Sequence, residues 1–118
     1  MYWLFKDESQ MTRAIQTLAT RAELAFADGL TTGHKPSERF WKLIDGLGQL
    51  SHGEQVLLRF MQDMWNGDGK VGVAELFDLD ADNQALVLGL LAAMSKGPAA
   101  VEQWIESGPA KSHEGEQA

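Results

Sequence analysis

The sequence contains no cysteine among its 118 residues. This absence excludes disulfide bonds, thiolate metal sites and cysteine nucleophiles, and it suits a reducing cytoplasm. Long apolar runs are also missing: the longest, from Ala85 to Met94, spans ten residues, about half of what a membrane-spanning helix requires. The stretch Met1–Asp7 lacks the basic segment and the longer apolar run of a secretory signal peptide. We therefore expect a cytoplasmic protein without a membrane segment.

Basic side chains are scarce, and they are unevenly distributed. The chain has 17 Asp and Glu residues against 10 Lys and Arg, which gives a net charge of −7. Residues 1–59 carry seven basic and seven acidic side chains, whereas residues 60–118 carry three and ten. Binding to a phosphate backbone requires a basic stripe, so we expect no direct contact with nucleic acid. The acidic half suits a basic partner or a cation, although acidic loops are often only well solvated.

The sequence contains no complete catalytic or metal-ligand motif. Its three histidines do not stand at metal-ligand spacing with one another or with a carboxylate. The nucleophile-elbow and phosphate-loop motifs are both missing. Asp78, Asp80 and Asp82 would support acid–base chemistry only if burial moved their pKa values apart. An exposed helix start is the more ordinary interpretation of that run.

Apolar periodicity predicts an all-α fold in a single domain over residues 1–107, followed by a disordered polar tail at 108–118. We expect a compact bundle of four main helices plus one or two short ones. The main helices are predicted at 9–28, 36–48, 51–65 and 80–96, and the short ones at 73–77 and 99–106. Residues 1–5 are expected to form a short extended arm.

Local signals fix several of these helix ends. Ser51 and Glu54 have the spacing of a capping box, and Asp80 is a suitable N-cap. Ser9 is predicted to cap the first helix, and Pro36 suits the first turn of the second. The run from Ala85 to Met94 has no polar residue on any face, which predicts that its helix lies at the centre of the bundle.

The loop after the third main helix contains part of a metal-binding pattern. When Gly69 is placed at the invariant glycine, Asn66 and Asp68 take oxygen-ligand positions and Glu75 takes the last, bidentate position. This stretch resembles the calcium loop of an EF-hand, and the resemblance implies a degenerate calcium site at Asn66, Asp68 and Glu75. Met64 stands where the first ligand belongs, and no second loop is present to pair with this one.

Our leading hypothesis is a non-enzymatic protein-interaction module, an adaptor or an inhibitor, which presents an acidic loop surface to a basic protein partner. The expected contact residues are Asp63, Asp68, Glu75, Asp78, Asp80 and Asp82, together with Trp65. Tryptophans at helical positions are usually core residues. Of the four tryptophans in the chain, Trp65 and Trp3 are the two for which a core position is least expected, and Trp65 lies beside the loop, so it is included. The alternatives are the single EF-hand-like calcium loop and, last, a carboxylate-dependent enzyme. No cofactor is expected, and the oligomeric state stays open.

Overall fold

The computed structural model describes residues 2–107, apart from the side chain of Tyr2. The fold is all-α with one minimal hairpin, and the tail predicted at 108–118 lies outside the described residues. In chain order the elements are η1 (Tyr2–Leu4), α1 (Glu8–Arg21), β1 (Thr31–Thr32), β2 (Lys35–Pro36), α2 (Glu38–Asp45), η2 (Leu47–Gln49), α3 (His52–Asn66), α4 (Val73–Phe77), α5 (Ala81–Lys96) and α6 (Pro98–Ser107). None of these helices is both long enough and apolar enough to cross a bilayer.

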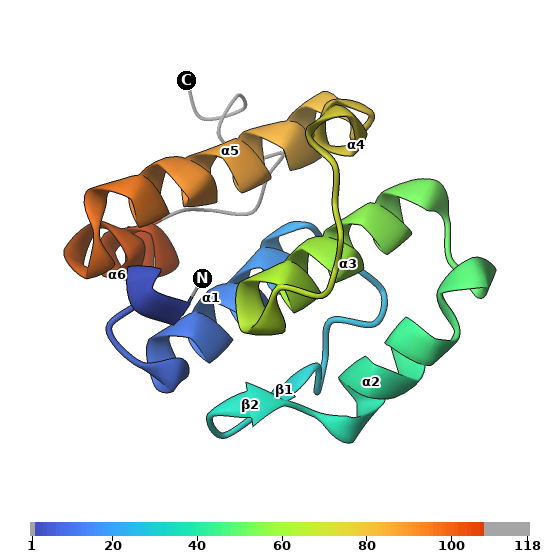
Figure 1. Cartoon of the computed structure of the whole chain (residues 1–118), viewed down its shortest axis with the longest axis horizontal. Helices are drawn as coiled ribbons and strands as arrows, with labels where there is room; N and C mark the ends of the chain where they lie inside the picture. Colours follow the sequence, from blue (N-terminus) through green and yellow to red (C-terminus); the bar gives the residue numbers. More distant parts are fainter. Residues whose placement is uncertain (1, 108–118) are drawn as a thin grey trace.

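Helices α1 and α3 form the centre of the molecule. They lie across the middle of Figure 1, with α2 and the hairpin on one side and α5 with α6 on the other. Helix α1 contacts α3, α5, α6 and both strands. Helix α3 buries apolar residues along most of its length, and these are Val56, Leu57, Leu58, Phe60, Met61 and Met64. The core is therefore built around the two helices that bury the most side chains.

Helix α5 does not lie at the centre, so the prediction from its apolar run was wrong. It forms one side of the molecule in Figure 1, against α6, α1 and α4. Leu90 on its inner face is fully buried, whereas Leu88 on its outer face is 45% exposed. A helix that is apolar on every side has no polar face to show which side meets water. The sequence pattern therefore could not distinguish a central helix from a peripheral one.

Two predicted caps are confirmed. The Ser51 hydroxyl accepts from the Glu54 amide at 3.3 Å, and the Glu54 carboxylate accepts from the Ser51 amide at 2.9 Å. The Asp80 carboxylate accepts from the Asn83 amide at 2.8 Å. These contacts fix the starts of α3, which precedes the acidic loop, and of α5, which follows α4.

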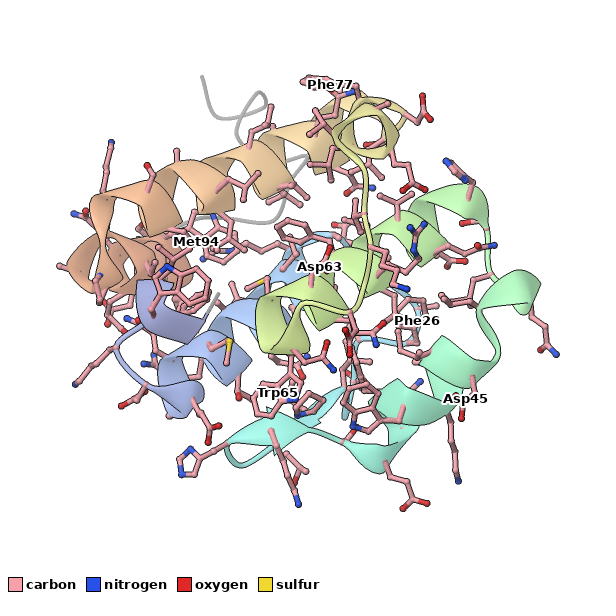
Figure 2. The ribbon with its side chains drawn as sticks, viewed as in Figure 1. Phe26, Asp45, Asp63, Trp65, Phe77 and Met94 are labelled. Carbon is pink, nitrogen blue, oxygen red and sulfur yellow. The ribbon has the colours of Figure 1, made fainter. Side chains whose placement is uncertain are left out.

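The N-terminal third differs from the prediction in several places. Residues 2–4 form a 3-10 turn rather than an extended arm. Asp7, not Ser9, caps α1, and the helix ends at Arg21 because Glu23 takes a positive φ of 58°. Phe26 still reaches the core, but it does so from a turn (Figure 2).

The second helix is shorter than predicted. Pro36 lies in β2, and Ser37 caps α2 through its hydroxyl, which accepts from the Phe40 amide at 3.3 Å. Gly46 is the C-cap, so α2 ends at Asp45 and the next residues form a separate 3-10 turn. Gly46 was the weak point of the predicted helix, because a mid-helix glycine is unfavourable.

Polar residues of α1 hold α6 in place. Arg21, only 8% exposed, donates to the Trp104 and Ile105 carbonyls at 2.6 and 2.7 Å. Arg13 forms a two-point ion pair with Glu102 at 2.8 Å. That pair, with a further hydrogen bond from Gln10, lowers the pKa of Glu102 to about 2. Because α6 packs along α5, these bonds also set the position of α5.

Candidate protein-interaction surface

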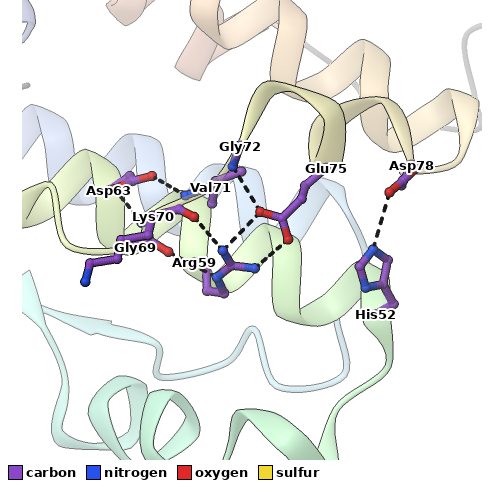
Figure 3. Close-up of polar contacts among 9 residues, drawn as sticks. All are labelled: His52, Arg59, Asp63, Gly69, Lys70, Val71, Gly72, Glu75 and Asp78. Carbon is purple, nitrogen blue, oxygen red and sulfur yellow. Dashed lines mark hydrogen bonds and ion pairs between the residues drawn. The ribbon is translucent and has the colours of Figure 1, made fainter.

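The α3–α4 loop, residues 67–72, is packed directly onto α3. The Asp63 carboxylate accepts from the Lys70 and Val71 amides at 3.1 and 3.0 Å (Figure 3). Gly69 is buried against the helix, and a Cβ added there would lie 1.8 Å from the Arg59 carbonyl oxygen. Only a glycine permits this approach. Gly69 of the loop and Asp63 of α3 therefore fix the position of the loop on the helix.

Arg59 of α3 is the centre of the loop's hydrogen-bond network. It donates to the Gly69 and Lys70 carbonyls at 3.0 and 2.6 Å. It also forms a two-point ion pair with Glu75 at 2.7 and 3.0 Å. The Glu75 carboxylate also accepts from the Gly72 amide at 2.9 Å. The bond to Arg59, followed by that to Gly72, lowers the pKa of Glu75 to about 2.

This network bears directly on the calcium hypothesis. In the EF-hand frame, Glu75 supplies the last ligand and the Lys70 carbonyl another, and both oxygens contact the Arg59 guanidinium. The Asn66 side-chain oxygen accepts from the Asp68 amide at 2.9 Å. No group of three or more histidines and carboxylates within residues 2–107 could hold a metal ion. The Arg59 guanidinium thus occupies the position that the EF-hand resemblance assigns to calcium, and this arrangement weighs against the calcium hypothesis.

The predicted contact residues differ in whether their carboxylates accept hydrogen bonds from the protein's own backbone. Asp63, Glu75 and Asp80 hold the protein's own backbone, as described above. Asp78 is exposed and lies 3.8 Å from His52 (Figure 3). Asp68 and Asp82 are exposed, with no side-chain hydrogen bond or ion pair to the part of the chain that the structure describes.

The exposed carboxylates do not form one surface. Asp78 lies beside His52 at the start of α3, whereas Asp68 adjoins Gly69, which packs near Asp63. His52 and Asp63 are roughly 16 Å apart along the helix axis. Trp65 is half-buried against the core, and Figure 2 shows it far from Phe77. Asp78 and Asp82 lie on either side of the α4–α5 connection and are candidates for one contact surface, with the exposed N-cap Asp80 between them.

Large exposed apolar side chains next to these two carboxylates are the feature that the sequence interpretation missed. Val73 is 72% exposed and Phe77 is 60% exposed, and both lie on the same side of α4 because they are four residues apart. Figure 2 shows Phe77 at the outer edge of the molecule. The sequence did contain a signal for this exposure, namely the shortness of the predicted helix at 73–77. Leu76 packs against the core, and a helix of five residues cannot also bury Val73 and Phe77.

Helix α5 continues this apolar surface. The side-chain amide of Gln84 donates to the Phe77 and Leu79 carbonyls at 3.0 and 2.7 Å. Leu88 is four residues after Gln84 and therefore lies one turn further along the same side of α5. We call this surface the α4–α5 face. It consists of the exposed residues Val73, Phe77, Asp78, Ala81, Asp82, Ala85 and Leu88.

Two hollows of the described surface lie elsewhere. One, of about 320 Å³, lies between α5 and α6 and is lined by Gly89, Lys96 and Trp104 among others. The second, of about 390 Å³, is lined by Asp7, Glu8, Ser9 and His34. Neither is lined by Asp78, Asp80 or Asp82, so neither gathers the carboxylates on which the enzyme hypothesis depends.

Comparison with known proteins returns no relative: no protein-family model, curated protein or solved structure matches this chain.

Proposed function

We propose that this protein is a non-enzymatic protein-interaction module, an adaptor or an inhibitor, which presents the α4–α5 face to a basic protein partner. The observation that carries the proposal is the high exposure of Val73 and Phe77, at 72% and 60%, beside the exposed carboxylates of Asp78 and Asp82. Apolar patches rimmed by polar groups are typical of contact sites on soluble proteins.

The two kinds of residue on this face contribute different properties to binding. Burial of Val73, Phe77 and Leu88 by a partner supplies most of the favourable free energy, because apolar area leaves water. The carboxylates of Asp78 and Asp82 favour a basic partner and speed its approach, and the net charge of −7 acts in the same direction. The same charge disfavours nucleic acid, so the proposed partner is a protein. The expected compartment remains the cytoplasm.

The arginine partners of Glu75 and Glu102 argue against a catalytic role for these two carboxylates. The pKa values of Glu75 and Glu102 are lowered to about 2, in each case mainly by an arginine. A general acid or base needs a pKa near the working pH. Carboxylates held ionised by arginine stabilise the fold and do not exchange protons at neutral pH.

Affinity capture from native lysate, with chemical cross-linking at the bait, tests this proposal. Val73→Ser/Phe77→Ser removes the apolar part of the face, and Asp78→Asn/Asp82→Asn removes its charge. Glu38→Gln/Asp45→Asn makes the same charge change on α2, far from Phe77 in Figure 2.

We expect one basic protein to be captured and cross-linked by the wild type and by the α2 variant, and to be lost from both face variants. Identical captured proteins for all four baits would overturn the proposal.

A further inference from the structure

We propose that the partner contacts this protein through an amphipathic α-helix that lies antiparallel along the outer face of α5, with its basic residues toward its C-terminal end. This inference rests on the proposed function and specifies the chemistry of the partner.

The outer face of α5 has the pattern of a helix-packing surface. The buried residues of α5 include Asn83, Val87, Leu90 and Met94. The exposed residues Ala81, Ala85, Leu88 and Ala92 have the same spacing of four, three and four, but on the opposite side. That spacing is typical of the apolar stripe by which a helix packs against a neighbour. The outer face of α5 thus carries a second apolar stripe, and no described element covers it.

The side chains along this stripe suit a neighbouring helix. Three of the four are alanines, which let a second helix approach to roughly 8–10 Å between axes. Leu88 supplies one larger side chain in the middle of the stripe. Phe77 of α4 stands at one flank, where Gln84 binds its carbonyl. The alanines, Leu88 and Phe77 together form a shallow apolar surface that can bind the apolar side of an amphipathic helix.

Charge distinguishes the two ends of the stripe. Asp78, Asp80 and Asp82 surround the N-terminal end of α5, and Lys96 ends its last turn. Basic side chains of a partner helix are therefore attracted to the N-terminal end. In an antiparallel arrangement that end faces the partner's C-terminus, where basic residues also stabilise the partner helix itself. Acidic residues at the partner's N-terminus would likewise meet Lys96.

A second copy of this chain suits the face less well. Two copies would each bring a net charge of −7, and three carboxylates at one end of the stripe would face a single lysine at the other. Like charges of this size oppose association. The surface is therefore assigned to a basic partner rather than to self-association.

Two labelled peptides of about 18 residues, or five helical turns, test the inference. Both carry the same apolar stripe and the same composition. One has lysines in its C-terminal half and glutamates in its N-terminal half, and the other has the reverse order. Binding is measured by fluorescence anisotropy with the full chain, and helix formation by circular dichroism.

We expect the peptide with C-terminal lysines to bind about tenfold more tightly, a difference that a few cross-interface ion pairs can supply. Leu88→Ser should weaken binding of this peptide, and Asp78→Asn/Asp82→Asn should reduce the preference between peptides. Glu38→Gln/Asp45→Asn should change neither. Equal binding of the two peptides, or binding that is insensitive to Leu88→Ser, would overturn the inference.

Three further outcomes are decisive. If a basic protein is captured through the α4–α5 face but neither peptide binds, the helical partner is wrong and the proposed function stands. If the face variants leave capture unchanged, the proposed function falls as well. Analytical ultracentrifugation of the full chain covers self-association: a dimer that Leu88→Ser dissociates would show that the occupant is a second copy.

Discussion

In the α3–α4 loop, Asp63 and Glu75 bind the protein's own amides and Arg59. A few residues later, on the α4–α5 face, Asp78 and Asp82 point to solvent next to Phe77. Both regions belong to the acidic half of the chain, and their composition does not separate them. The difference is that the first group has internal partners, which are Arg59 for Glu75 and the Lys70 and Val71 amides for Asp63. An acidic stretch becomes a candidate contact surface only where the fold leaves its charges unused.

The comparison also explains why the loop is an unpromising place for ligands. Its carbonyls at Gly69 and Lys70 contact a guanidinium, its amides at Lys70 and Val71 contact a carboxylate, and Gly69 is wedged against α3. Polar groups that are already satisfied gain little from a new partner. The α4–α5 face, by contrast, can gain free energy from a partner, because burial of Val73 and Phe77 removes apolar surface from water.

The largest expected effect is that of Gly69→Ala on the loop. A Cβ at this position would lie 1.8 Å from the Arg59 carbonyl oxygen, and neither backbone can move without displacing the other. We expect a loss of roughly 3 kcal/mol or more in the free energy of unfolding, at or beyond the upper end for overpacking. Urea denaturation measures it.

Gly67→Ala is the matched control for that loop substitution. Gly67 has a φ of +79° but no atom within 4 Å of an added Cβ, so the cost should be only about 1 kcal/mol of backbone strain. Equal losses for the two variants would mean that the loop is not seated on α3 as described.

Arg59→Met should have the next largest effect. The substitution removes donors from the Gly69 and Lys70 carbonyls and from the Glu75 carboxylate. The pair with Glu75 is partly exposed, so solvent compensates in part, and we expect a loss of about 1–2 kcal/mol. Hydrogen exchange should show faster exchange at the Lys70 and Val71 amides. Unchanged exchange there would show that Asp63 alone holds the loop.

The ion pair of Glu75 predicts a pH dependence of stability. Its pKa is lowered from 4.5 to about 2 by Arg59 and Gly72, so the unfolded chain takes up protons at a higher pH than the folded protein. The stabilisation is therefore full above pH 4.5 and is lost as the pH falls toward 2. Glu102 acts in the same direction.

Urea midpoints of the wild type and Glu75→Gln, measured from pH 7 down to 2, check this pH dependence. The two should differ at neutral pH and converge at low pH. Glu38→Gln, at an exposed position on α2, should follow the wild type throughout. A constant difference between the wild type and Glu75→Gln would contradict the assignment.

On the other side of the comparison, Phe77→Ser should barely change stability. Its side chain is 60% exposed, so the loss should stay within about 0.5 kcal/mol, as for ordinary surface substitutions. Leu79→Ala, two residues later at a buried position, should cost about 2–5 kcal/mol. If Phe77→Ser is as costly as Leu79→Ala, α4 packs through Phe77 and the α4–α5 face is not free for a partner.

Interactions between residues near in sequence were predictable. Ser51 with Glu54, and Asp80 with the first turn of α5, are local pairs whose geometry follows from spacing. The ion pair between Arg59 and Glu75 spans 16 positions, and no periodicity indicates it. The end of α1 was missed because the apolar spacing continues to Phe26, although the chain turns at Glu23.

The α4–α5 face was not predictable for a different reason. An apolar side chain in a sequence is expected to be buried, and nothing local distinguishes Leu88 from Leu90. Which of the two faces the core depends on how α5 packs against α1, α4 and α6, and the contacts with α1 join residues far apart in the sequence. The charges of this face were visible in the sequence, but its apolar part required the fold.

The smallest expected effect is that of calcium, for which we predict no change in the melting temperature at ~10 µM free ion. Arg59 contacts the oxygens of Glu75 and Lys70. Met64, at the position of the first ligand, is fully buried within α3. Any binding should therefore fall in the ~millimolar range of the weakest calcium modules. Since a ligand of the folded state must raise its stability, thermal melts with calcium, and with magnesium as the control, measure this directly. A calcium-specific rise of several degrees that Asp68→Ala abolishes would make the loop a calcium site, and the loop, not the α4–α5 face, would then be the functional region.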